Sequence, residues 1–217
     1  MKRWTRETVR KPSAAGESPR AGLNRRMALK TGLLAGAGVL ATPTPRAAVG
    51  TTRNMHLSLA AYSMRQALTG GQMDLFQFID WCAELGLPGT ELTSYYFPED
   101  FNGAYLRQLR NRAFRNGVTI SGTAVRNNFC LPPGPEKTRW IEHVRTWIDH
   151  AAELFAPHIR IFAGDVPEGV DKETGIGWVA DGVKAVLDRA GERGIMIGLE
   201  NHGGITAEAR DQSLIHI

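Results

Sequence analysis

The strongest constraint on the fold is a regular alternation of two patterns from Met55 onward. Short apolar runs typical of buried strands occur at residues 57–63, 89–93, 118–125, 158–163 and 195–199. Between them, apolar residues recur at helical spacing, as in the stripe of Ile141, Val144 and Ile148. The predicted order is β-α-β-α-β-α-β-α-β. Repeated units of this kind imply a parallel sheet, either closed or open.

Local signals set the predicted helix ends. Asp74 precedes the first helical segment and Gly86 follows it, and Gly117 closes the second. The third helix is expected to begin near Pro135, and the fourth to close at Gly191 or Gly194. The tryptophans that fall on these helices are expected to serve packing; they are Trp81, Trp140, Trp147 and Trp178.

The residues after each predicted strand favour a closed barrel. No glycine-rich phosphate-binding pattern follows the first strand, where residues 61–65 read Ala-Tyr-Ser-Met-Arg. Polar residues instead recur at the carboxyl end of every strand, which is what a barrel active site requires. We therefore expect an α/β fold of the (β/α)8 TIM-barrel type, of which this chain carries about the first five βα units.

The fifth predicted strand gives the clearest functional signal. Its apolar residues end in Glu200, Asn201 and His202, followed by two glycines. A carboxylate two residues from an imidazole indicates metal binding, acid–base chemistry or both. The alternative is structural: Glu200 forms an ion pair and His202 caps a loop.

Four segments carry a resemblance to a known family: Leu57–Tyr62, Gly89–Glu91, Arg160–Gly164 and Gly198–Gly204. Through them, roughly residues 55–208 resemble the sugar isomerase/epimerase superfamily with the xylose isomerase-like TIM barrel. That superfamily also contains endonuclease IV-type enzymes.

The resemblance implies an enzyme that moves a proton beside the carbonyl of a sugar or sugar derivative. It implies that Glu200 is both a catalytic carboxylate and a ligand of a divalent metal ion, such as Mn, Mg, Co or Zn. It also implies that His202 contacts the substrate. The metal would polarise the carbonyl and make the neighbouring C–H acidic.

Further candidate substrate contacts lie at other strand ends, and each has a structural alternative. Tyr62 could line the pocket or pack in the core, and Glu91 could orient a substrate or pair with Arg126 or Arg160. Asn127 could line the pocket or form a turn, and Glu168 could contact substrate or remain an exposed loop charge. For Arg160, in the middle of a strand, we expect a buried pair with a carboxylate.

A complete barrel has eight strands, whereas five are predicted before Ile217. In the family, the remaining metal ligands come from the last three strands. We therefore expect a truncated member, with a partial barrel over residues 49–217. The alternative to an enzyme is a non-catalytic or inactive remnant that binds carbohydrate.

Residues 1–48 form a basic leader with the features of an export signal. Arg25 and Arg26 precede a weakly apolar run at residues 31–41 and a stretch of small residues. Paired arginines in this context indicate the twin-arginine translocation machinery as a partner and the periplasm as the destination. The apolar run is shorter than the roughly 20 residues of a membrane span. An uncleaved signal that anchors the protein in the membrane is the alternative.

Charge is unevenly distributed and argues against nucleic acid as a partner. The leader holds ten of the 26 basic residues but only two of the 22 acidic ones, so the remainder is acidic, with a net charge of −4. An acidic body with an export signal disfavours the endonuclease alternative.

Overall fold

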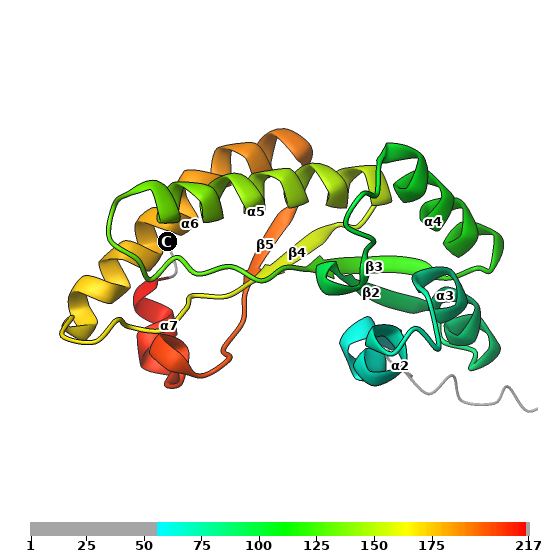
Figure 1. Cartoon of the computed structure of the whole chain (residues 1–217), viewed down its shortest axis with the longest axis horizontal. Helices are drawn as coiled ribbons and strands as arrows, with labels where there is room; N and C mark the ends of the chain where they lie inside the picture. Colours follow the sequence, from blue (N-terminus) through cyan, green and yellow to red (C-terminus); the bar gives the residue numbers. More distant parts are fainter. Residues whose placement is uncertain (1–55, 216–217) are drawn as a thin grey trace, which may run out of the picture. The chain divides into compact units, whose positions relative to one another are not determined.

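The computed structural model describes residues 56–215. These residues form five strands, covered by helices (Figure 1). The strands are β1 (Ser58–Ala60), β2 (Gly89–Thr93), β3 (Thr119–Ala124), β4 (His158–Ile161) and β5 (Met196–Leu199). The α-helices are α2 (Arg65–Thr69), α3 (Leu75–Glu84), α4 (Gly103–Arg115), α5 (Pro135–Leu154), α6 (Lys172–Arg193) and α7 (Ala209–Ile215). Short 3-10 turns are η1 (Ala61–Met64), η2 (Ser94–Tyr96) and η3 (Gly204–Thr206).

The sheet is parallel throughout, and its strands lie in the order β1-β2-β3-β4-β5. Each strand is therefore bonded to the strands that precede and follow it in sequence. An open nucleotide-binding sheet reverses this order at a switch point, whereas a barrel winds in one direction only. The observed order confirms the predicted barrel-type fold and all five predicted strands.

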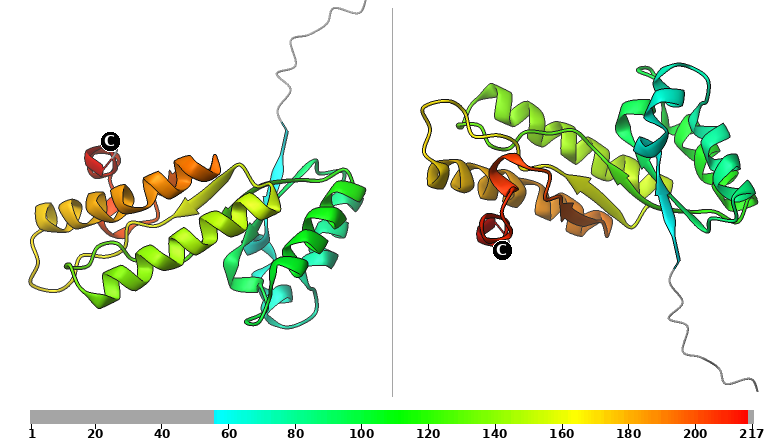
Figure 2. Two further views of the ribbon diagram at one scale, coloured as in Figure 1. Left: turned by 90° about the horizontal axis from the view of Figure 1, so that it is seen from above. Right: turned by 90° about the horizontal axis from the view of Figure 1, so that it is seen from below.

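Four helices form a covering layer in which each packs against the next: α3 on α4, α4 on α5 and α5 on α6. Both views of Figure 2 show α5 and α6 side by side along β4 and β5. The helices cover one face of the sheet. The opposite face corresponds to the inside of a barrel, and no helix of this layer covers it.

Strand periodicity assigns side chains to these two faces. Leu92 of β2 and Ile159 and Ile161 of β4 are fully buried in the core, together with helix residues such as Phe78 and Ile148. Glu91 and Arg160, which alternate with these residues along β2 and β4, are only partly buried. Because successive side chains on a strand point to opposite faces, these polar residues lie on the inner face.

The expected helix signals are present, with one unpredicted exception. Asp74 caps α3 in a reciprocal capping box with Gln77. α5 begins at Pro135, and Gly194 caps the C-terminal end of α6 with a φ of 67°, the left-handed conformation that glycine adopts readily. The exception is Phe155, which ends α5 with a φ of 59°.

Three elements differ from the sequence prediction. The strand predicted over residues 57–63 is shorter, because β1 covers only Ser58–Ala60 and the 3-10 turn η1 follows at Ala61–Met64. α6 begins at Lys172, capped by Asp171, a start that was not predicted. α2 was not predicted because its five residues are too few to show a helical apolar stripe.

The four helical tryptophans lie in α3, α5 and α6, as predicted. Cys82 and Cys130 are buried free thiols. Within residues 56–215, no helix has the length and apolar character needed to cross a membrane. The predicted leader and signal segment lie outside the described residues.

Candidate functional site

Glu200 stands at the carboxyl end of β5 and joins two neighbouring side chains. Its backbone N–H donates to the carbonyl of Ile161 at 3.0 Å, which continues the pairing of β5 with β4 by one residue. Its carboxylate Oε2 lies 2.7 Å from Nε of Arg160, and Oε1 lies 2.6 Å from Nδ1 of His202. The carboxylate therefore has a fixed orientation.

Arg160 is itself held on three sides. Besides the bond to Glu200, its Nη1 donates to the carbonyl of Val125 at 2.9 Å. Its guanidinium carbon lies 4.0 Å from the centre of the Phe162 ring, a cation–π contact. The ring of His202 lies 4.5 Å from the same Phe162 ring. Phe162 thus supports both partners of Glu200.

The exposed fraction of these side chains increases from Arg160 through Glu200 to His202. The Arg160 side chain is 15% exposed, that of Glu200 36% and that of His202 64%. The guanidinium is therefore buried behind the carboxylate, while the imidazole is open to solvent.

Glu91 of β2 lies on the same inner face and has a different electrostatic environment. Burial raises the pKa of its carboxyl, Arg160 and His158 oppose that rise, and the charge of Glu200 adds to it. No ion pair of Glu91 is found among the described residues. Glu91 therefore keeps a proton more readily than an ordinary glutamate.

The two glutamates line one cavity of about 320 Å³, the central cavity, with side chains from the ends of four strands. Its lining residues are Ala60, Tyr62, Glu91, Tyr95, Arg160, Phe162, Glu200 and His202. The cavity lies at the carboxyl ends of the strands, where barrel enzymes carry their active sites.

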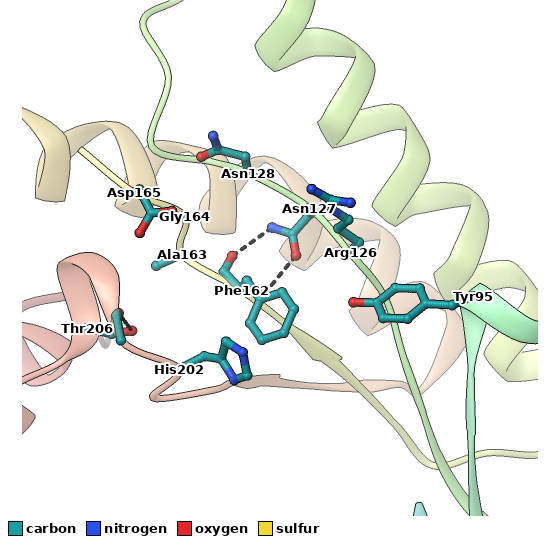
Figure 3. A pocket seen from close by; sticks show the side chains of 11 residues that line it. Tyr95, Arg126, Asn127, Asn128, Phe162, Ala163, Gly164, Asp165, His202 and Thr206 are labelled. Carbon is teal, nitrogen blue, oxygen red and sulfur yellow. Dashed lines mark hydrogen bonds between the residues drawn. The ribbon is translucent and has the colours of Figure 1, made fainter. Parts of the chain in front are cut away.

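A second cavity of about 390 Å³, the side cavity, adjoins the first and shares Tyr95, Phe162 and His202 with it (Figure 3). Asn127 lies in its wall, and its amide is fully engaged. Nδ2 donates to the carbonyl of Phe162, and Oδ1 accepts from the N–H of Phe162, both at 2.7 Å (dashed in Figure 3). This residue is only 4% exposed. Its side chain thus extends the pairing of β3 with β4 as a backbone peptide would.

The structure brings four of the six predicted site residues into the central cavity: Tyr62, Glu91, Glu200 and His202. Asn127 lines only the side cavity, with its amide bonded to the backbone. Glu168 is exposed in a turn after β4 and lines neither cavity. The carboxylate partner predicted for Arg160 is Glu200, and the pair is only partly buried, with the Glu200 side chain 36% exposed.

Two aromatic residues of the site were missed from the sequence. Tyr95 lines both cavities, and its signal was the pair Tyr95-Tyr96 directly after a predicted strand end. Phe162 also lines both, and strand alternation from His158 and Arg160 already placed it on the polar face.

The described residues do not form a complete site for the predicted divalent metal. Within residues 56–215, no group of three or more His, Cys, Asp or Glu side chains is placed to hold a metal ion. Both carboxylate oxygens of Glu200 already have partners, and a guanidinium on one oxygen competes with a cation for it. Divalent cations need several donors, and Glu200 can supply at most one ligand. Glu200 alone therefore cannot form the site.

Comparison with known proteins agrees with this fold. The family model described as xylose isomerase-like TIM barrel matches residues 79–212. Among curated proteins, none matches the chain.

Solved structures share the fold at low sequence identity. D-psicose 3-epimerase with D-tagatose, from Clostridium cellulolyticum H10, is 16% identical with a TM-score of 0.61. The match covers 75% of this chain and 60% of the epimerase chain. A Sinorhizobium meliloti protein is 23% identical with a TM-score of 0.54, and the match covers 66% of this chain and 49% of that protein's chain. The IolI protein with a bound zinc atom is 14% identical with a TM-score of 0.53, covering 67% and 51%. This chain therefore spans about half to three fifths of the length of these structures.

Proposed function

This chain belongs to the xylose isomerase-like TIM barrel family, and on that basis we propose that it acts in the isomerisation or epimerisation of a sugar or sugar derivative. The observation that carries the proposal is the oriented carboxylate of Glu200, which faces a cavity at the carboxyl ends of the strands. Solved structures with a similar fold include sugar epimerases, which supports the substrate class.

The proposed reaction is proton transfer next to a carbonyl group. A base removes the proton from the carbon beside the carbonyl, and an enediolate forms. For an isomer, the proton returns to the former carbonyl carbon while the hydroxyl proton moves to the former carbonyl oxygen. For an epimer, an acid on the opposite side of the original carbon delivers a proton to its other face. Glu200 is the proposed base, because Arg160 and His202 fix the direction of its carboxylate before substrate arrives.

Three residues of the central cavity are proposed to bind the substrate. A protonated Glu91 carboxyl donates a hydrogen bond to a substrate oxygen, a form that its burial favours. His202 uses Nδ1 for Glu200, so Nε2 is the ring nitrogen that can reach a substrate oxygen. Tyr62 is half exposed and supplies an aromatic wall.

The divalent metal stays a proposal, in which Glu200 supplies one ligand. It requires further donors in addition to the described residues, and no step above passes through it. When bound in such a site, a metal ion would polarise the substrate carbonyl.

The decisive experiment uses deuterium exchange from solvent. The protein is incubated in D2O with D-fructose, D-psicose or D-tagatose, and loss of the proton beside the carbonyl is followed by NMR. We expect Glu200→Gln to lower the exchange rate by about 100-fold or more, because a positioned base contributes about that factor. Exposed Glu208→Gln is the matched control and should exchange as wild type does. Near-normal exchange by a folded Glu200→Gln variant contradicts the proposal.

One observation favours a second candidate, carbohydrate binding without turnover. Both oxygens of Glu200 are already engaged by side chains of the protein, as in a purely structural ion pair. This candidate predicts that wild-type protein binds the same sugars and exchanges no deuterium with any of them.

We also propose export through the twin-arginine machinery, on the basis of Arg25, Arg26 and the apolar run that follows them. In bacteria that carry this machinery, wild-type protein should reach the periplasm, and Arg25→Lys with Arg26→Lys should retain it in the cytoplasm. Equal export of the paired variant contradicts this route.

A further inference from the structure

A third cavity, the outer cavity, lies beside the proposed site and is not used by the proposed chemistry. It measures about 560 Å³ and is lined by Tyr62, Arg65, Gln66, Thr69, Gly70, Tyr95 and Tyr96. Two of these residues, Tyr62 and Tyr95, also line the central cavity. The two cavities are therefore neighbours, and Tyr62 and Tyr95 form the aromatic boundary that they share.

The outer cavity gathers three of the four tyrosines of the chain. The rings of Tyr62 and Tyr95 meet edge to face, with centres 6.5 Å apart, and those of Tyr95 and Tyr96 lie 6.1 Å apart. Tyr62 is 49% exposed and Tyr95 is 41% exposed, so large aromatic surfaces face solvent here. Tyrosine combines a flat apolar ring with a hydrogen-bonding hydroxyl and few rotatable bonds, which suits ligands that are partly apolar and partly polar.

The other wall of the outer cavity is α2, a helix that buries none of its residues. It places Arg65, Gln66 and Thr69 along the cavity, and the Arg65 guanidinium carbon lies 5.2 Å from the centre of the Tyr62 ring. The outer cavity thus presents aromatic rings on one side and hydrogen-bonding groups on the other. A sugar ring has the matching chemistry: C–H groups on its faces and hydroxyl groups around its edge.

Size supports a ligand that spans both cavities. Each has a volume within the roughly 300–1,000 Å³ of small-ligand sites, and the outer cavity is the more open of the two. One monosaccharide in the central cavity would leave the outer cavity to water. A second ring joined to the first would cross the boundary at Tyr62 and Tyr95.

We propose that the outer cavity binds a second sugar unit, so that the preferred substrate class is a reducing disaccharide, whose free end keeps the carbonyl that the proposed chemistry needs. This inference rests on the proposed function, because it assumes that the first unit occupies the central cavity. The recognised chemistry is a neutral pyranose or furanose ring stacked on Tyr95 or Tyr96 and hydrogen-bonded by α2.

The test compares dissociation constants for matched sugars on the full chain, by isothermal titration calorimetry and ligand-observed NMR. The monosaccharides are D-glucose, D-galactose and D-fructose, and the reducing disaccharides are cellobiose, lactose and lactulose. We expect at least one disaccharide to bind about tenfold or more tightly than each of its component sugars, a difference of about 1.4 kcal/mol.

Variants then locate the second unit. Gln66→Ala removes a polar group of the outer cavity and should weaken disaccharide binding about fivefold, with monosaccharide binding unchanged. Tyr96→Phe keeps the ring and should cause a smaller loss. The control is Gln72→Ala, an exposed glutamine beyond α2 that does not line the cavity, which should bind both classes as wild type does.

The outcomes separate the two proposals. If a monosaccharide binds as tightly as every disaccharide containing it, or Gln66→Ala weakens both classes equally, the outer cavity is not a sugar site, while the proposed function stands. If no sugar of either class binds, both proposals are overturned.

Discussion

Nε of Arg160 lies 2.7 Å from Oε2 of Glu200, so a strand-middle cation fixes the carboxylate at the end of the neighbouring strand. In the register of β4 with β5, Arg160 is paired with Gly198, two residues before Glu200. The arginine therefore reaches forward along the inner face. Gly198 has no side chain that could stand between them.

The first prediction concerns this ion pair. Arg160→Met keeps the length of the side chain and removes its charge. We expect the free energy of unfolding to fall by about 1–2 kcal/mol, between the values for exposed and buried pairs, because Arg160 is largely buried and Glu200 is half exposed. Urea denaturation measures this loss.

Arg107→Met is the matched control, because its 3.4 Å bridge to Glu153 is exposed on the helix layer. Its cost should stay within about 0.5 kcal/mol. If both variants lose the same free energy of unfolding, the Arg160–Glu200 pair stabilises the fold no more than an exposed ion pair does, which contradicts the prediction.

The second prediction concerns Glu91 and the pH dependence of stability. Burial raises its pKa in the folded protein, so the folded state binds this proton more tightly than the unfolded chain does. Stability contributed by the protonated carboxyl should be lost as pH rises from its ordinary value, near 4.5, through the raised value. Arg160 and His158 on β4 and Glu200 on β5 are the charged groups that modulate this pKa.

Glu91→Gln removes this titration. We expect the variant to be more stable than wild type at neutral pH, and the difference to vanish below about pH 4. Denaturation midpoints at a series of pH values provide the comparison. A constant difference across the series contradicts the raised pKa.

The third prediction concerns the amide of Asn127. Asn127→Asp preserves its shape but replaces the donor to the Phe162 carbonyl with a second acceptor. We expect a loss of about 1–3 kcal/mol at neutral pH, since a buried hydrogen bond is lost and two oxygens face each other. The loss should shrink in acid, where the introduced carboxyl regains a proton to donate.

Asn128→Asp is the control for this substitution. Its Oδ1 accepts a hydrogen bond from the N–H of Cys130, a role that a carboxylate oxygen can also fill. Its stability should stay close to that of wild type. A larger loss at Asn128 than at Asn127 is the result that contradicts the account.

The fourth prediction concerns the close approach of β3 and β4 on the inner face. A Cβ added at Gly122 would lie 2.2 Å from Cε1 of His158, whose Nδ1 is bonded to the Ser121 carbonyl. Gly122→Ala should therefore cost about 1–3 kcal/mol. Removing the ring as well, with His158→Ala, should recover part of that cost in a double-mutant cycle.

Gly177→Ala provides the opposite expectation. This glycine lies inside α6, and an added Cβ would meet nothing within 4 Å. Alanine should raise stability by up to about 1 kcal/mol through helix propensity alone. If both alanine variants lose stability equally, crowding by His158 is not the cause at Gly122.

The elements that could be predicted are those whose signals are local. The five apolar runs specify strands, and Asp74, Gly117 and Pro135 specify helix ends, because each acts on its immediate neighbours. Arg160 was predicted to pair with a carboxylate because a charge in the middle of a strand needs a partner. Glu200 and His202 were found because two functional side chains follow one strand.

What could not be predicted depends on contacts between distant segments. Nothing near Asn127 indicates that its amide is taken up by the backbone of Phe162, 35 residues away. Tyr95 lines all three cavities because η2 follows β2 and faces both β4 and the segment after β1. α2 was missed because a five-residue helix without a buried face leaves no periodic trace in the sequence.

The absence of buried residues in α2 also bears on how such a protein changes over evolution. Leu68 packs partly against the core, but substitutions at the exposed positions of this helix leave the core intact and are less restricted by the stability threshold than buried positions are. Arg65, Gln66 and Thr69 can therefore vary while the sheet and the Arg160–Glu200 pair stay constant. Preference for one ligand over another can drift or be selected at this helix with little penalty to folding.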